Sequence, residues 1–360
     1  MPDPGRVSLS MRRAARGLVR GMRFFLEQRP PEVNQTPRTE VLRQGKLSVA
    51  RFEGGSRVHP LPVLLVPPLM VKPYIFDLRP GHSLAAYLLE QGFDVFLVDF
   101  GVPDRADQHV RIEDYVFEDL PRAIAAACQA TGRDRVVLVG YCMGGLFSLL
   151  YAAGQPERLA GLVLVACPVD FGKMGLISLV VQHAHRQMEA LIDRLGNVPG
   201  LLPSVAMRLT NPAATLAGYA DLFLRAWDEE YVKGFASMNA WLNDFIPGPG
   251  EAYKEYIRDF LVGNELVGGR VRLGQRELNV ARVECPVLSI AGTRDPIATV
   301  ESARAILDVV GSPNKEFCAM PGGHVGVLAG GRAPLTTWPK IAAWLASILP
   351  APTPADPARR

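Results

Sequence analysis

Three residues of this sequence have types and settings that suit nucleophilic catalysis: Cys142, Asp295 and His324. Each follows a short segment that predicts a strand, and each has glycine or proline close by, where the chain turns. A thiolate is a strong nucleophile, an imidazole can take the proton of the thiol, and a carboxylate can orient the imidazole and stabilise its charged form. We therefore predict Cys142 as nucleophile, His324 as base and Asp295 as the acid that supports the base.

Cys142 has the most specific setting of the three. The run Val136 to Val139 leads to Gly140, Cys142 and the pair Gly144-Gly145, and an apolar helical pattern begins at once. This strand, turn and helix form the pattern of a nucleophile elbow, in which side chains at the flanking glycines would collide with the neighbouring strand or helix. A lone cysteine after a strand is usually a packing residue, but the flanking glycines favour the catalytic interpretation.

Asp295 and His324 each have an ordinary interpretation when taken alone. Asp295 precedes Pro296 and suits a turn, and His324 follows two glycines and suits a loop. In a parallel sheet, however, catalytic groups gather at the carboxyl ends of the strands. Along the chain the order is nucleophile, acid, base, which is the order of the α/β-hydrolase fold. The joint placement therefore favours a catalytic triad.

Backbone amides should stabilise the oxyanion that forms when a carbonyl group is attacked. In an elbow, one of them is the N–H of the residue after the nucleophile, here Met143. The second should come from the loop after the apolar run Leu61 to Val66, near Leu69 or Met70.

Strand-like and helix-like segments alternate around these residues with short connections. The other predicted strands are Lys46 to Phe52, Leu61 to Val66, Phe93 to Phe100, Leu162 to Ala166, Val287 to Ala291 and Lys315 to Met320. The predicted helices are Ser83 to Gln91, Glu113 to Ala130, Met143 to Ala153, Val300 to Val309 and Pro334 to Leu349. This alternation predicts an α/β protein with a mostly parallel sheet covered by helices on both faces.

The alternation stops between residues 169 and 283, where only helix-like stretches are visible. A structureless loop of that length is unusual in a compact domain, so we interpret the segment as a helical cap inserted over the sheet. We expect residues 46–168 and 284–349 to form the α/β-hydrolase core. Residues 1–45 are expected to form a basic N-terminal helix and linker, and residues 350–360 a disordered tail.

Composition excludes several classes of protein. The 39 Lys and Arg nearly balance the 36 Asp and Glu, which argues against nucleic acid as a partner. No apolar stretch reaches the roughly 18 to 20 residues of a membrane-spanning helix, and arginines interrupt any secretory signal. The five cysteines show no CxxC pair and no metal-ligand spacing, so we expect a cytoplasmic protein without a metal.

The elbow Gly140 to Gly145 resembles two families, the dienelactone hydrolases, which are small and lack a large cap, and the polyhydroxyalkanoate synthases. Four further segments resemble the synthases: Val66 to Pro80, Cys167 to Phe171, Gly196 to Gly200 and Gly322 to Val327. The resemblance runs from about Lys46 to Leu349. In its lack of a long N-terminal domain the chain is most similar to the catalytic subunit of the short, two-subunit class III synthases.

That resemblance implies (R)-3-hydroxyacyl-CoA as substrate, a thioester on Cys142 and release of CoA, with no cofactor. A hydroxyl group would then attack the acyl-enzyme and extend a polyester. It further implies that His324 activates the thiol and that Asp295 helps to activate the 3-hydroxyl. A homodimer, a second non-catalytic subunit and the surface of a cytoplasmic polyester granule are the implied partners, and the basic N-terminal stretch would suit such a contact.

Two alternative functions stay open. The first is a capped hydrolase with a cysteine nucleophile, a thioesterase, esterase or relative of the dienelactone hydrolases, in which water accepts the acyl group. Pro296 stands where the synthase family usually has histidine. This difference leaves open whether water or a hydroxyl group accepts the acyl group. The second is a non-catalytic, granule-associated scaffold, which the complete set of triad positions disfavours.

Overall fold

Eight strands form the central sheet of the molecule. They are β1 (Arg38–Gln44), β2 (Leu47–Phe52), β3 (Pro62–Val66), β4 (Asp94–Asp99), β5 (Val136–Tyr141), β6 (Leu159–Val165), β11 (Val287–Gly292) and β12 (Lys315–Met320). Their order across the sheet is β1-β2-β4-β3-β5-β6-β11-β12. All pairs from β4 to β12 are parallel, and β1 and β2 add an antiparallel edge. The mostly parallel α/β-hydrolase sheet predicted from the alternating pattern is confirmed.

The computed structural model describes residues 31–210 and 212–349. Residues 1–30 of the predicted basic helix and linker, and the predicted tail, residues 350–360, lie outside the described residues. Within the described ranges, no helix combines the length and the apolar character that crossing a membrane requires.

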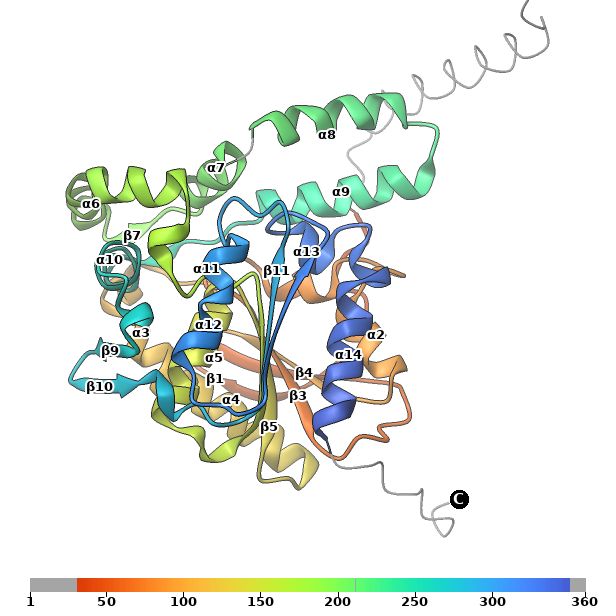
Figure 1. Ribbon diagram of the computed structural model, residues 1–360. Coiled ribbons are helices and arrows are strands. Elements are labelled where there is room, and N and C mark those ends of the chain that lie inside the picture. The colour runs from red at the N-terminus through yellow and green to blue at the C-terminus, as the bar shows by residue number, and fades with distance from the viewer. Residues whose placement is uncertain (1–30, 211, 350–360) are drawn as a thin grey trace, which may run out of the picture.

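Helices cover both faces of the sheet (Figure 1). On one face, Ile124, Leu146 and Ile306 from three helices share a core with the sheet. On the other face, Leu88 and Ile341 do the same. The helices of the first face are α4 (Leu120–Thr131), α5 (Met143–Gly154), α11 (Val300–Arg304) and α12 (Ile306–Val309), and those of the second are α2 (Leu84–Glu90), α13 (Gly326–Ala329) and α14 (Thr337–Ile348). Burial on both faces explains why the central strands are continuously apolar.

Two predicted helices are interrupted in the structure. The helix expected over Glu113 to Ala130 consists of α3 (Ile112–Asp114), a π-helical turn at Tyr115–Asp119 and α4. Pro121 has no N–H to donate to the carbonyl four residues earlier, so the regular hydrogen-bond ladder cannot pass through it. The helix expected over Val300 to Val309 likewise divides at Ala305 into α11 and α12.

The prediction that residues up to 45 form only a helix and linker is wrong for its last part. Residues 38–44 form β1, which pairs with β2 across a tight turn at Gly45, where φ is +58°. Such a left-handed conformation suits glycine. β1 escaped prediction because it is a half-exposed edge strand whose residues are mostly polar.

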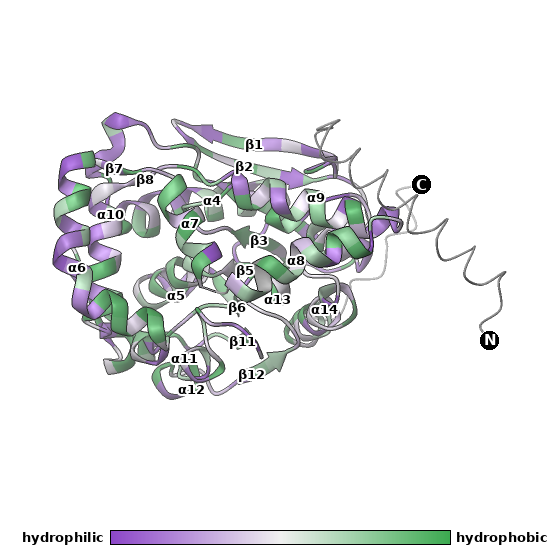
Figure 2. Ribbon diagram, turned by 90° about the horizontal axis from the view of Figure 1, so that it is seen from above, coloured by the Kyte–Doolittle hydropathy of each residue, from purple (hydrophilic) through white to green (hydrophobic). Residues whose placement is uncertain are grey.

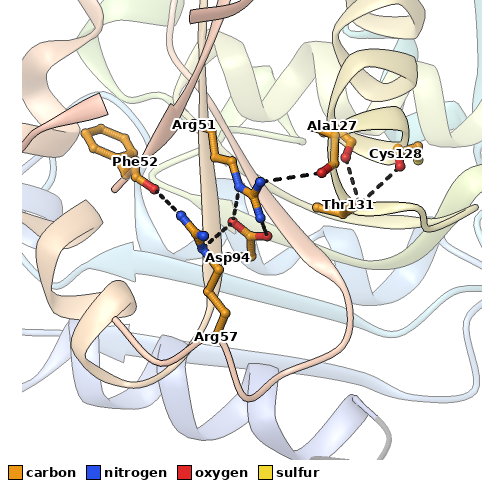
Figure 3. Close-up of polar contacts among 8 residues, drawn as sticks. Arg51, Phe52, Arg57, Asp94, Ala127, Cys128 and Thr131 are labelled. Carbon is orange, nitrogen blue, oxygen red and sulfur yellow. Dashed lines mark hydrogen bonds and ion pairs between the residues drawn. The ribbon is translucent and has the colours of Figure 1, made fainter. Parts of the chain in front are cut away.

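An ion-pair cluster fastens the antiparallel edge of the sheet to the core (Figure 3). Arg51 on β2 donates to both oxygens of Asp94 at the start of β4, over 2.9 and 2.6 Å, and to the carbonyl of Ala130 in α4. Arg57 reaches the same carboxylate at 3.3 Å. The cluster lies at the amino end of β4, and its role is therefore structural.

Four helices of the segment 169–283 lie above the carboxyl edge of the sheet (Figure 1). They are α6 (Leu176–Leu195), α7 (Leu201–Leu209), α8 (Pro212–Leu224) and α9 (Glu229–Asn243). Seen from above, α7, α8 and α9 lie over the sheet and α6 runs along one side (Figure 2). These helices thus lie on the side of the sheet at which the parallel strands end.

The expectation that this segment contains no strand is wrong. β9 (Arg270–Leu273) and β10 (Arg276–Asn279) form a hairpin, and the two-residue strands β7 (Asn197–Val198) and β8 (Gly248–Pro249) pair with each other. In the hairpin only Val271, Leu273 and Leu278 are buried, between exposed polar residues. Strands of four residues are too short for their alternation to be distinguished from a loop.

Candidate active site

Cys142 stands in the turn between β5 and α5 with a strained backbone. Its φ of 52° and ψ of −119° are rare for a residue with a side chain. Three hydrogen bonds hold the turn: the Cys142 N–H donates to the Val165 carbonyl over 2.9 Å, and the Cys142 carbonyl accepts from the N–H groups of Gly145 and Leu146. The side chain is thereby held at the carboxyl edge of the sheet, at the N-terminus of α5.

The glycines around Cys142 are required by close backbone contacts. A Cβ atom at Gly140 would lie 2.6 Å from the Gly144 carbonyl oxygen, and one at Gly144 would lie 2.2 Å from the Val66 carbonyl oxygen. Both distances are far below ordinary van der Waals contact. The second contact also places the loop after β3 directly beside the elbow.

The loops after β11 and β12 bring Asp295 and His324 together. His324 Nδ1 lies 2.9 Å from Asp295 Oδ2, and both residues are almost fully buried. Asp295 Oδ1 accepts hydrogen bonds from the N–H groups of Ile297 and Ala298 over 2.8 and 3.0 Å. One oxygen of the carboxylate thus fixes its own loop, and the other orients the imidazole.

The negative charge of Cys142 also acts on the His324 ring. Burial opposes the charged form of His324. The negative charges of Cys142 and Asp295, together with the hydrogen bond to Asp295, outweigh burial and raise the pKa of His324 to about 10. An imidazolium held beside Cys142 stabilises the thiolate, which is the reactive form of cysteine. The structure thus brings together the three residues that the sequence places after separate strands.

Of the predicted oxyanion-binding residues, Met143 directly follows Cys142, and Leu69 and Met70 lie on the loop after β3, whose first residues meet the elbow at Gly144. Within the described ranges, the N–H groups of Met143, Leu69 and Met70 donate no hydrogen bond. The loop that carries Leu69 and Met70 is held from the cap segment: the Met70 carbonyl accepts from the Ile246 N–H over 3.0 Å, and Trp241 Nε1 donates to the Lys72 carbonyl over 3.0 Å. These N–H groups are available to bind an oxyanion, and their role stays a prediction.

A cavity of about 300 Å³ leads from the cap helices to His324. The core contributes Arg294, Pro296 and His324 to its wall, and α9 contributes Phe235, Met238 and Leu242. The wall is mainly apolar, which suits an acyl group more than a sugar or a peptide. Among the residues that the structure describes, no cluster of three His, Cys, Asp or Glu side chains is arranged to hold a metal ion.

Tyr253 and Tyr256 were missed as candidate site residues. Both pack against the core on the α5 side of the sheet, and the negative charge of Cys142 acts on both phenols. They lie more than 100 residues after Cys142 in the cap segment. No motif marks them, because only the three-dimensional fold brings them to the elbow.

The comparisons with known proteins concern the fold and the family of the chain. A family model described as alpha/beta hydrolase fold matches residues 76–329. The chain is 33% identical over 347 residues to the poly(3-hydroxyalkanoate) polymerase subunit PhaC of Allochromatium vinosum, covering 95% of this chain and 97% of the relative. It is also 33% identical over 317 residues to the subunit of that name from Haloferax mediterranei, covering 87% of this chain and 64% of the relative.

A similar solved structure is that of a monoacylglycerol lipase from Paleococcus ferrophilus. Its TM-score is 0.53 at 18% sequence identity, over 84% of this chain and 99% of the lipase. At this level of identity the likeness concerns the fold alone.

Proposed function

This chain belongs to the PhaC family of poly(3-hydroxyalkanoate) polymerase subunits, within the alpha/beta hydrolase fold, and from that premise we propose that it polymerises (R)-3-hydroxyacyl groups from coenzyme A thioesters. The observation that carries the proposal is the 33% identity over nearly the full length of both this chain and the Allochromatium vinosum subunit. The contact of Cys142 with His324, and of His324 with Asp295, supports a cysteine-based acyl transfer.

In the proposed first step, the Cys142 thiolate attacks the carbonyl carbon of the acyl-CoA. The carbonyl oxygen becomes an oxyanion, which the N–H of Met143 and an N–H of Leu69 or Met70 stabilise. The bond between the carbonyl carbon and the CoA sulfur then breaks, and His324 gives its proton to the leaving CoA thiolate. The products are free CoA and a thioester on Cys142.

In the second step, the hydroxyl group of a hydroxyacyl unit attacks the Cys142 thioester. His324, now neutral, takes the proton of this hydroxyl, an ester bond forms, and Cys142 leaves as the thiolate. Both oxygens of Asp295 are already engaged, one by His324 and one by two backbone N–H groups. This favours a role for Asp295 through His324 over direct activation of the 3-hydroxyl.

The alternative of a capped hydrolase, in which water attacks the Cys142 thioester, is not favoured. Curated relatives with identities of 33%, 33% and 31% are named as polymerase subunits. Hydrolases are among the similar solved structures, but at 18% identity the likeness concerns the fold alone. A non-catalytic scaffold would have no use for a strained Cys142 in contact with His324.

The proposed partners and location follow from the same function. We propose a homodimer, a second non-catalytic subunit and attachment to polyester granules in the cytoplasm. Exposed apolar side chains on the cap helices, among them Leu209, Leu216 and Phe223, would suit contact with an apolar polymer or a partner. All five cysteines are free thiols, as expected in a reducing compartment.

The proposal is tested by following acylation. With (R)-3-hydroxybutyryl-CoA, the wild type should release CoA and gain the mass of covalently attached acyl units. Cys142→Ala should do neither, whereas Cys285→Ala, which alters a half-buried thiol just before the amino end of β11, should behave as wild type. Continued CoA release by Cys142→Ala would overturn the proposed mechanism.

A further inference from the structure

Two arginine side chains line the cavity of about 300 Å³ that leads to His324. Arg294 comes from the loop after β11 and Arg208 from α7, so the core and the cap each contribute one positive charge. Among the described residues that line the cavity, none is an aspartate or a glutamate. Two cations in a wall without carboxylates favour a ligand that carries negative charge.

Arg294 has a fixed backbone and an unpaired side chain. Its N–H donates to the Gly322 carbonyl over 2.9 Å, which ties the loop after β11 to the loop that carries His324. Arg294 is exposed, and its side chain forms no hydrogen bond or ion pair with any residue that the structure describes. The carboxylate next to it in the chain, that of Asp295, is already bound by His324 and by two backbone N–H groups. The positive charge of Arg294 is therefore not neutralised within the described part of the chain.

Arg208 is held at the same cavity from the cap. Its Nη2 donates to Oδ1 of Asn243 over 2.7 Å, so the charge is fixed between α7 and the C-terminal end of α9. A guanidinium group stays protonated in proteins and offers five N–H donors in a fork that suits phosphate oxygens. The cavity thus carries two groups of the kind that recognises phosphate, one from each side.

The proposed substrate has its charge far from its reacting end. An acyl-CoA carries the thioester at one end of the pantetheine arm and phosphate groups at the other. In the proposed first step the sulfur lies at His324, and the arm can lie along the apolar wall that α9 contributes to the cavity. We propose that Arg294, together with Arg208, binds the phosphate groups of the coenzyme A portion, so that this cavity holds the CoA arm. This assignment rests on the proposed function.

The test compares Arg294→Gln with the wild type on two thioesters of (R)-3-hydroxybutyrate, one with coenzyme A and one with pantetheine, which has no phosphate group. The first release of thiol is followed as a function of substrate concentration. For the CoA thioester, we expect the half-saturating concentration to rise by about tenfold with little change in maximal rate, because the lost contact is equally strong before and during the reaction. The pantetheine thioester should react alike in the two proteins. Arg294→Lys, which keeps the positive charge, should lose less than Arg294→Gln.

Arg282→Gln is the matched control. Arg282 is also exposed, but it lies before the amino end of β11, whereas Arg294 follows the carboxyl end of the same strand. This variant should match the wild type with both thioesters. In the wild type itself, added salt should raise the half-saturating concentration of the CoA thioester and leave that of the pantetheine thioester unchanged, because salt screens contacts between charges. That measurement does not depend on the folding of a variant.

An unchanged half-saturating concentration of the CoA thioester in Arg294→Gln would overturn this assignment alone. An equal loss with both thioesters would also overturn it, because Arg294 would then act through the position of His324 and not through phosphate. A wild type whose reaction with the CoA thioester does not respond to salt would do the same. Absence of thiol release by the wild type from both thioesters would instead overturn the proposed function, and this assignment with it.

Discussion

His324 Nδ1 lies 2.9 Å from Asp295 Oδ2, and the two residues follow the neighbouring parallel strands β11 and β12. Strand pairing therefore fixes their distance, whereas Cys142 reaches His324 from β5, two strands away from β11. Asp295 is further anchored by the N–H groups of Ile297 and Ala298. The base is thus oriented by a hydrogen-bonded loop that follows a paired strand.

Loss of the Asp295 carboxylate should disturb this orientation of His324. Asp295→Asn removes the negative charge beside His324 and offers an amide where the imidazole N–H needs an acceptor. We expect the first release of CoA from (R)-3-hydroxybutyryl-CoA to slow by about 100-fold or more. Rapid-mixing measurement of free thiol checks this. Asp308→Asn, a change on the exposed side of α12, is the control. A loss of less than threefold in Asp295→Asn would show that the carboxylate has no catalytic part.

The raised pKa of His324 makes the stability of the folded protein depend on pH. The pKa of His324 is raised to about 10 in the folded protein from about 6.5 for an ordinary histidine, so folding is favoured by protonation of His324. This contribution is fully present below about pH 6.5 and is lost as the pH rises through about 10. The difference in free energy of unfolding between the wild type and His324→Gln should therefore shrink steadily from pH 6.5 to pH 10.

Urea unfolding of both proteins across this range measures that difference. Subtracting the free energy of unfolding of the variant from that of the wild type cancels the contributions of all groups that titrate alike in the two proteins. A difference that stays constant or grows with rising pH would contradict the assignment of a charged, ion-paired His324.

The close approach of Gly144 to the Val66 carbonyl should be required for both stability and acylation. Gly144→Ala places a methyl group 2.2 Å from the Val66 carbonyl oxygen, so the loop after β3 must move away from Cys142. We expect a loss of about 1 to 3 kcal/mol in the free energy of unfolding, together with slower acylation. Gly268→Ala meets no atom within 4 Å and should stay within about 0.5 kcal/mol of wild type. Equal stability of the two variants would show that the close approach is not required.

The parts of the site that local sequence could predict are those that backbone geometry dictates. Glycines on both sides of Cys142 are needed wherever a nucleophile stands on a turn between a buried strand and a helix. Asp295 and His324 were predictable because each follows a predicted strand, and parallel strands end at the same edge of the sheet. The same reasoning placed the loop after β3 beside Met143.

The parts that escaped prediction depend on tertiary contacts or on weak patterns. β1 and the hairpin of β9 and β10 are short or half-exposed, so their polar residues conceal the alternation. The π-helical turn at Tyr115–Asp119 keeps the apolar spacing of a helix, and only the hydrogen bonds reveal it. Tyr253 carries no local signal, because the path of the whole cap segment brings it against the core on the α5 side of the sheet.

The central claim is that a hydroxyl group, and not water, accepts the acyl group from Cys142. It is tested most directly by incubating the full-length protein with (R)-3-hydroxybutyryl-CoA and measuring the size of the products by gel-permeation chromatography. We predict release of CoA together with polyester chains of many units, and neither product with Cys142→Ala. Release of CoA with free 3-hydroxybutyrate as the sole acyl product would contradict the claim and identify the protein as a hydrolase.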